Sequence, residues 1–140
     1  MKKWIYFVIG IFLIIVLFIG ILRYGFDKTG EDSWIKDERG IWIKHGNPSD
    51  IPGEVNVQQK IIECANKLYD DEKNNGVVFN SQCLGECDGF VVDIVHVPRN
   101  SDDNKIENQC EDYRNGKYND FVELDLNGDV VRFVEIMELN

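Results

Sequence analysis

Residues 90–97, Phe-Val-Val-Asp-Ile-Val-His-Val, form the most strongly β-prone stretch of this chain. β-Branched and aromatic side chains favour an extended backbone, and here both alternating faces are largely apolar. A strand of this kind has other elements packed on each side, so we expect residues 90–97 to be the central strand of a sheet. Pro98 ends this strand, because proline cannot donate the next hydrogen bond of the ladder.

Toward the C-terminus, Asn127-Gly128 indicates a β-hairpin between residues 121–126 and 129–136. Asn-Gly is the strongest two-residue hairpin signal, because both residues tolerate the positive φ angles of a type I′ turn. The cross-strand pairs that a two-residue turn predicts are Val122 with Phe133, Glu123 with Arg132, and Leu124 with Val131. Apolar pairs then share one face and a charge pair lies on the other, so each face is internally consistent.

Toward the N-terminus, residues 56–75 carry the apolar pattern of an amphipathic helix. Asn56 and Gln59 are spaced as a capping-box pair at its start, and Gly76 follows its end as a left-handed stop. The apolar stripe recurs at spacings of three and four residues and comprises Val57, Ile61, Cys64, Ala65 and Leu68. We therefore expect this helix to bury one face against the sheet.

The rest of the domain consists of shorter predicted segments. Residues 41–45 and 77–79 are predicted strands, residues 80–89 a loop, and residues 99–117 a polar segment with a short helix around 106–113. Strand, helix, two strands and hairpin follow one another without the alternation of a βαβ fold. The sequence therefore predicts an α+β class in which one main helix packs on an antiparallel sheet.

The N-terminal residues 4–22, from Trp4 to Leu22, contain no charged side chain. As a helix rising ~1.5 Å per residue they span ~28 Å, close to the ~30 Å of a bilayer core. The run is longer than the apolar part of a signal peptide and lacks a small-residue cleavage site, so we expect an uncleaved signal anchor. Lys2 and Lys3 predict a cytoplasmic N-terminus, because cytoplasmic flanks carry the excess of basic residues.

The predicted organisation has three parts. Residues 1–23 are a single transmembrane helix in the cell membrane, residues 24–34 a polar linker, and residues 35–140 an extracytoplasmic domain. The lipid bilayer is the expected partner of residues 4–22. The formal net charge of the chain is −10, and an acidic surface repels phosphate groups, so nucleic acid is not an expected partner.

Four cysteines, Cys64, Cys83, Cys87 and Cys110, follow the predicted anchor. An even number of cysteines in a small domain on the oxidising side of a membrane predicts two disulfides. The preferred pairing joins Cys64 to one of the two central cysteines and Cys110 to the other, because long closed loops restrict the unfolded chain most. The alternative is a zinc site of four thiolates, although zinc ribbons have two close cysteine pairs and this sequence has one.

Two polar residues of the central strand, Asp93 and His96, are the possible functional side chains. A carboxylate among apolar neighbours needs a partner. The candidate partners are Arg99, Arg114 and Arg132, and the expected setting of Asp93 is either a buried ion pair or a position at the end of the sheet. His96 is expected on the opposite face by strand alternation. A thiol of Cys83 or Cys87 beside His96 is the route to a catalytic dyad, and disulfide formation removes that thiol.

The sequence contains no nucleotide-binding loop, nucleophile elbow or metalloprotease motif, so we predict no catalytic, cofactor-binding or metal-ligating residue. The favoured function is a non-enzymatic, membrane-anchored extracytoplasmic domain that has a structural role or binds a protein partner. A small Cys/His enzyme or a zinc-binding domain is the alternative from another functional class.

An apolar N-terminal helix followed by a head of helix, antiparallel sheet and disulfides is similar to the architecture of type IV pilins. This resemblance implies a pilin-like or pseudopilin-like filament subunit. It is a resemblance of layout, since the sequence has no Gly-Phe leader junction and no Glu near the start of the apolar run.

Overall fold

The structure is a computed structural model of the chain, and it describes residues 14–15 and 32–136. Residues 32–136 fall in one compact unit that starts at Asp32. The predicted membrane segment, residues 4–22, lies outside the described residues except for Ile14 and Ile15, which are helical. Among the described residues, no helix is both long and apolar enough to cross a bilayer.

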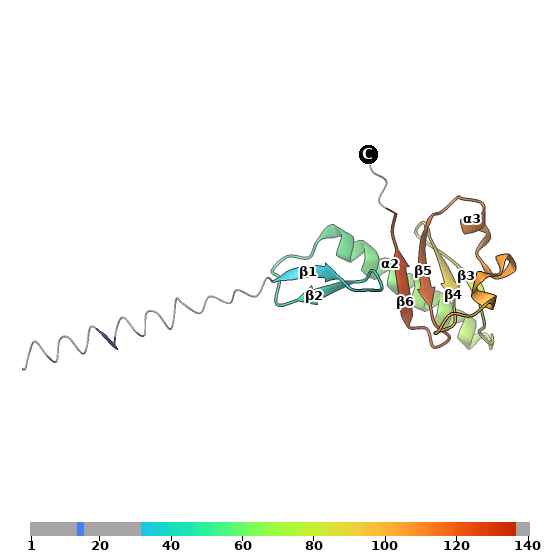
Figure 1. The fold of residues 1–140 in the computed structure, drawn as a ribbon, viewed down its shortest axis with the longest axis horizontal. Helices are drawn as coiled ribbons and strands as arrows, with labels where there is room; N and C mark the ends of the chain where they lie inside the picture. Colours follow the sequence, from blue (N-terminus) through green and yellow to red (C-terminus); the bar gives the residue numbers. More distant parts are fainter. Residues whose placement is uncertain (1–13, 16–31, 137–140) are drawn as a thin grey trace, which may run out of the picture. The chain divides into compact units, whose positions relative to one another are not determined.

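The domain contains a small hairpin, one main helix and a four-stranded sheet (Figure 1). The hairpin pairs β1 (Ser33–Lys36) with β2 (Trp42–His45), and α2 (Gly53–Asn74) follows it. The sheet strands are β3 (Gln82–Cys87), β4 (Phe90–Ile94), β5 (Asp120–Leu124) and β6 (Val130–Val134), in that spatial order. Between β4 and β5 lie the short helical turns η1 (Asp102–Asn104), η2 (Ile106–Asn108) and α3 (Glu111–Arg114). The predicted α+β class is confirmed.

The prediction of an antiparallel sheet is wrong at its centre, because β4 and β5 are parallel. The outer pairs, β3 with β4 and β5 with β6, are antiparallel, so the sheet is mixed. Parallel neighbours require a long connection that returns the chain to the edge from which it started. Residues 95–119 make this connection, and the polar segment is therefore a crossover between two central strands.

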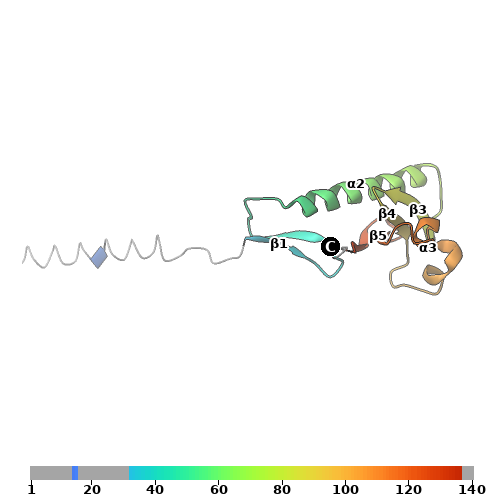
Figure 2. The same cartoon turned by 90° about the horizontal axis from the view of Figure 1, so that it is seen from above.

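Helix α2 packs along one face of the sheet, as Figure 2 shows from above. It starts at Gly53 rather than at residue 56, and no side chain caps its first turn. The buried residues of the helix are Val55, Gln58, Ile61, Ala65 and Tyr69. Val57, which was predicted for this stripe, is 46% exposed. Two neighbouring stripes fit the 3.6-residue period in this segment, so the pattern alone leaves the rotation of the helix open.

Two glycines occupy positions that require a positive φ. Gly76 ends α2 at φ +81°, and its N–H donates to the carbonyl of Lys73 at 3.1 Å, as in a Schellman motif. Gly128 ends the turn between β5 and β6 at φ +93°, and a Cβ atom there would lie 2.7 Å from the ring of Tyr69. The predicted helix stop at Gly76 is confirmed.

The predicted register of the C-terminal hairpin is confirmed for the pairs farther from the turn and is wrong for the pair next to the turn. The confirmed pairs are Val122 with Phe133 and Glu123 with Arg132. Leu124 instead faces Val130, because the turn spans residues 126–128 rather than two residues. The N–H of Asp125 donates to the carbonyl of Asp129 at 2.9 Å and closes this longer loop. A bulge in β6 absorbs the extra residue.

The segment before β4 also differs from the prediction. Residues 77–79, a predicted strand, are irregular, and residues 80–89, a predicted loop, contain β3. Pairing with β4 overrides the weak strand propensity of the Gly- and Cys-containing stretch. Strand β4 ends at Ile94, so His96 lies beyond the strand in which it was predicted.

A buried glutamine connects the β1–β2 hairpin to α2. Gln58 is 4% exposed, accepts a hydrogen bond from the Trp42 N–H at 2.7 Å, and donates to the Gly40 carbonyl at 3.0 Å. At the tip of the hairpin, the Arg39 carbonyl accepts from the Phe133 N–H of β6 at 2.7 Å. These bonds attach the hairpin to the helix and to the edge of the sheet.

Candidate functional site

All four cysteines form disulfides, Cys64–Cys87 and Cys83–Cys110, and no free cysteine remains. This is the predicted pairing scheme, in which each outer cysteine bonds to one of the central pair. The oxidised sulfurs leave no thiolate for the zinc site or for a dyad with His96. Two such bridges in a small domain fit a disulfide-stabilised extracellular protein.

The two disulfides lie on opposite faces of the sheet. Cys83 faces Asp93 in the β3–β4 ladder, whereas Cys87 faces Phe90. Side chains at an even spacing share a face in a regular strand, but a bulge between Cys83 and Gly85 shifts the register by one residue. Cys87 therefore reaches α2 on one side, and Cys83 reaches the crossover segment on the other.

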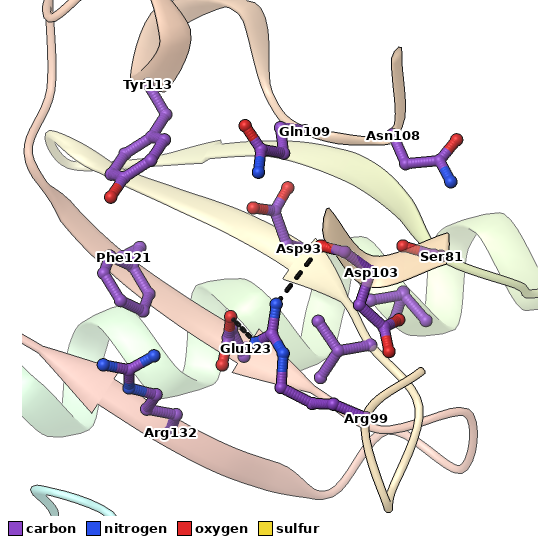
Figure 3. Close-up of a pocket in the computed structure, with 12 residues that line it drawn as sticks. Ser81, Asp93, Arg99, Asp103, Asn108, Gln109, Tyr113, Phe121, Glu123 and Arg132 are labelled. Atoms are coloured by element: carbon purple, nitrogen blue, oxygen red, sulfur yellow. Dashed lines mark hydrogen bonds and ion pairs between the residues drawn. The ribbon is translucent and has the colours of Figure 1, made fainter. Parts of the chain in front are cut away.

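The face opposite α2 carries a cavity of about 130 Å³, shown in Figure 3. Its floor consists of Asp93 from β4 and Phe121 and Glu123 from β5, and the crossover segment forms its walls. Asp93 and Glu123 are directly opposite each other in the parallel β4–β5 ladder. Two carboxyl groups thus lie side by side on the same face of the sheet.

An arginine from the crossover pairs with one of these carboxylates. The Arg99 guanidinium donates to Glu123 Oε1 at 2.5 Å and to the Asp103 carbonyl at 3.2 Å (Figure 3). The side chain of Glu123 is only 10% exposed, so this ion pair is largely buried on the acidic side. Arg132, the cross-strand neighbour of Glu123, instead lies over the Phe121 ring, with 5.0 Å between Cζ and the ring centroid.

Asp93 forms no ion pair with any described residue, and it is the last residue but one of β4, so of the two expected settings the structure shows the position near the end of a strand. Burial is the main cause that raises the pKa of Asp93 to about 7. The backbone N–H of Cys110 lowers this pKa, and the negative charge of Glu123 raises it. Arg99 lowers the pKa only from a distance, because its guanidinium is bound to Glu123. Asp93 is therefore a carboxyl group that exchanges its proton near neutral pH.

The Cys83–Cys110 disulfide contacts Asp93 directly. The Cys110 sulfur lies 3.0 Å from Asp93 Oδ1, and the three side chains form a compact group whose potential ligand atoms lie within 4.8 Å of one another. A disulfide sulfur has no proton to donate and is not a thiolate, so it neither satisfies the carboxylate nor offers a metal ligand. The contact fixes the position of Asp93 without neutralising it.

His96 lies at the edge of this site and has a different partner. Its Nδ1 is 2.9 Å from Asp103 Oδ1, and its backbone N–H donates to the same oxygen at 3.0 Å. The Asn100 N–H donates to the other oxygen, Asp103 Oδ2, at 2.7 Å. Burial raises the pKa of Asp103, but the hydrogen bonds from Asn100 and His96 lower it more, and the net pKa is lowered. This fully buried carboxylate holds the loop after β4 in place.

The structure thus places Asp93 in the cavity and His96 in the loop beside it, and the cysteine sulfurs near the site are oxidised to a disulfide. Sequence reasoning missed Ser81 and Glu123 as members of the site, and it named Arg99 only as a candidate partner of Asp93. The available signal was the odd-numbered positions of β5, because the predicted register already placed Glu123 on the face opposite Val122. Comparison of the chain with protein-family models, with curated proteins and with solved structures finds no match.

Proposed function

We propose that this chain is a single-pass membrane protein whose C-terminal domain is an extracytoplasmic, disulfide-stapled binding domain without catalytic activity. The observation that carries this proposal is the complete pairing of the cysteines between separate layers of the domain. Structural disulfides persist in oxidising compartments and are rare in the cytosol. Both bridges therefore support an extracytoplasmic location.

The N-terminal sequence supports the same location independently. The uncharged residues 4–22 are long enough for a bilayer-spanning helix, and Lys2 and Lys3 precede them. A basic N-terminal flank favours retention of that end in the cytoplasm. The domain that follows would then fold on the oxidising side, where its disulfides form.

A binding role is supported by the cavity on the polar face of the sheet. The cavity is lined by charged groups from three strands and the crossover, and Asp93 within it forms no ion pair with any described residue. A purely structural domain gains nothing from an uncompensated carboxyl group in a half-buried position, because its desolvation costs free energy. We therefore infer that this cavity is the ligand site of the domain.

Thiol labelling of intact cells tests location and cysteine state together. A membrane-impermeant maleimide should label the wild-type protein only after a reductant has been added. The Lys67→Cys variant, with one added thiol on the exposed side of α2, is the matched control and should be labelled without reductant. Labelling of the wild type without reductant, or labelling of the variant only after lysis, would contradict the proposed function.

A further inference from the structure

We propose that the cavity opposite α2 binds the primary ammonium group of a small amine, with Asp93 as its counter-ion and Ser81 as a second hydrogen-bond acceptor. This inference rests on the proposed function in that it takes the cavity as the ligand site of a binding domain. It adds the chemical class of the ligand and the two side chains that recognise it.

The size of the cavity limits the ligand to a few atoms. Its volume is about 130 Å³. An engineered apolar cavity of ~150 Å³ holds one benzene molecule, so the space here fits roughly six non-hydrogen atoms. An alkylammonium of three or four heavy atoms fills much of it and leaves room for the hydrogen bonds of the ammonium group.

The charges around the cavity leave one carboxyl group for a cationic ligand. Arg99 is engaged by Glu123 at 2.5 Å, and Asp103 is engaged by His96 at 2.9 Å. Arg132 lies over the ring of Phe121 rather than on a carboxylate. Asp93 is the remaining anionic group, and an ammonium ion beside it supplies the charge that the protein does not.

Ser81 provides an independent indication of a polar ligand. The residue is 6% exposed and lines the cavity, and its hydroxyl has no hydrogen-bond partner in the described part of the chain. Figure 3 shows the hydroxyl oxygen on the side that faces Asp93. Ser81 precedes Cys83 by one strand period, and Cys83 is paired with Asp93, so the two polar groups share a face.

The geometry favours a primary ammonium group over other cations. A primary ammonium has three N–H donors, and acceptors are offered by Asp93 on β4 and by Ser81, the residue before β3. The side-chain amide of Gln109 lies above Asp93 in Figure 3, with its nitrogen toward the carboxyl group and its oxygen turned away. A quaternary ammonium has the same charge but no donor, so it leaves both acceptors unsatisfied.

Binding of an ammonium ion should depend on pH through Asp93. The other charged or titratable groups on the cavity are Glu123 on β5, Arg132 on β6, Arg99 and Asp103 on the crossover, and Tyr113 on α3. Because the pKa of Asp93 is about 7, protons compete with the ligand below neutral pH. An alkylammonium keeps its charge over this range, so its dissociation constant should rise about 30-fold from roughly pH 8.5 to roughly pH 5.5.

The test uses the purified full chain in detergent with its disulfides intact, titrated with n-propylammonium and followed by NMR chemical shifts. We expect saturable binding at alkaline pH that perturbs signals of β4 and β5. Two size-matched probes separate the contributions: n-propanol lacks the charge, and tetramethylammonium lacks the N–H donors. Both should bind about tenfold more weakly or worse. Equal binding of either probe would overturn the proposal.

Two substitutions in the site and one control complete the test. Asp93→Asn should weaken n-propylammonium binding at least about tenfold and abolish its pH dependence, and Ser81→Ala should weaken it about tenfold with the pH dependence retained. Asp70→Asn removes the same charge from the exposed face of α2 and should leave binding unchanged. Native disulfides and a cooperative unfolding transition in each variant show that the fold is kept.

The source of the ammonium group is distinguished by a further arm. N-Acetyl-lysine methylamide presents the same group on a stem that is attached to a backbone, so tighter binding than n-propylammonium would identify a lysine side chain as the natural source. Tighter binding of the free amine would identify a small molecule. Failure of both amines overturns this inference alone, because the thiol-labelling result on intact cells does not depend on the ligand. Labelling without reductant overturns the proposed function, and amine binding by the purified chain remains measurable.

Discussion

The two faces of the four-stranded sheet are formed by the same strands, yet one is a dry core and the other a polar cavity. On the face toward α2, Val92, Ile94, Val122 and Leu124 have no measurable exposure, and Phe133 is 5% exposed. On the opposite face lie Asp93, Glu123 and Arg132, covered by the crossover segment. The difference arises because neighbouring residues of a strand point to opposite sides, so each face has its own composition.

Each face is closed by a different kind of cover and by its own disulfide. The regular helix α2 covers the apolar face and is attached through Cys64–Cys87. The irregular crossover covers the polar face and is attached through Cys83–Cys110. An irregular segment has backbone groups and polar side chains that line a cavity, whereas a helix uses its backbone groups internally. The apolar face therefore forms the core of the domain, and the cavity lies on the polar face.

The largest expected effect comes from removing one bridge from each face in turn. Cys64→Ala/Cys87→Ala and Cys83→Ala/Cys110→Ala each release a loop of similar length, with sequence separations of 23 and 27. Each double variant should lose about 3.5 kcal/mol of unfolding free energy in the chain-entropy model, measured by urea denaturation. Only the second should also weaken n-propylammonium binding, because its bridge holds the crossover over the cavity. Equal loss of binding in both variants would contradict the separation of the faces.

The next largest effect is expected from the apolar face. Leu124→Ala should lower the unfolding free energy by about 3 kcal/mol, because it leaves a cavity beneath α2 that the core cannot fill. Leu126→Ala, in the turn just beyond β5, is the matched control. Leu126 is 38% exposed, so its loss should be under about 1 kcal/mol. Similar losses in the two variants would show that the face toward α2 is not the main stabilising contact.

Asp93 on the polar face should make the stability of the domain depend on pH. The pKa of Asp93 is about 7 in the folded protein and ~3.9 in an unfolded chain, so between these values only the folded protein holds the proton. The contribution of Asp93 to the free energy of unfolding therefore falls as the pH rises from about 4 to about 7 and is constant above that. The unfolding free energy of Asp93→Asn should rise by on the order of 2 kcal/mol relative to that of the wild type over this range, after allowance for partial solvent access. Urea denaturation at a series of pH values measures the difference, and a constant difference would refute the raised pKa.

The smallest expected effect concerns a single hydrogen bond at the edge of the core. The Tyr69 hydroxyl donates to the Leu126 carbonyl at 3.1 Å, while its ring stacks on Phe79 with centroids 4.5 Å apart. Tyr69→Phe keeps the ring and removes the bond, so it should cost about 1 kcal/mol of unfolding free energy. Amine binding should not change, because this bond is on the α2 side of the sheet. Calorimetric unfolding together with the NMR titration checks both statements.

Elements whose signals are local could be predicted from the amino-acid sequence alone. The main helix, predicted over 56–75 and observed over 53–74, its stop at Gly76, and the hairpin pairs Val122–Phe133 and Glu123–Arg132 follow from patterns within one segment. The cysteine scheme follows from loop lengths and chemistry, and the structure has one of the two connectivities that fit it. Each of these features depends on residues close in sequence or on the four cysteines alone, and the physical rules for them are strong.

Features that depend on pairing between distant segments could not be predicted in this way and are seen only in the folded domain. The parallel pairing of β4 with β5, and the bulge that sends Cys87 and Cys83 to opposite faces, are properties of the assembled sheet. In the assembled sheet Asp93 also lies beside Glu123, and Arg99 forms an ion pair with Glu123. The alternation of side chains within one strand predicts which residues share a face. It does not predict which strand is the neighbour, because register and direction are set by the whole core. The candidate site therefore forms only when the strands and the crossover are assembled.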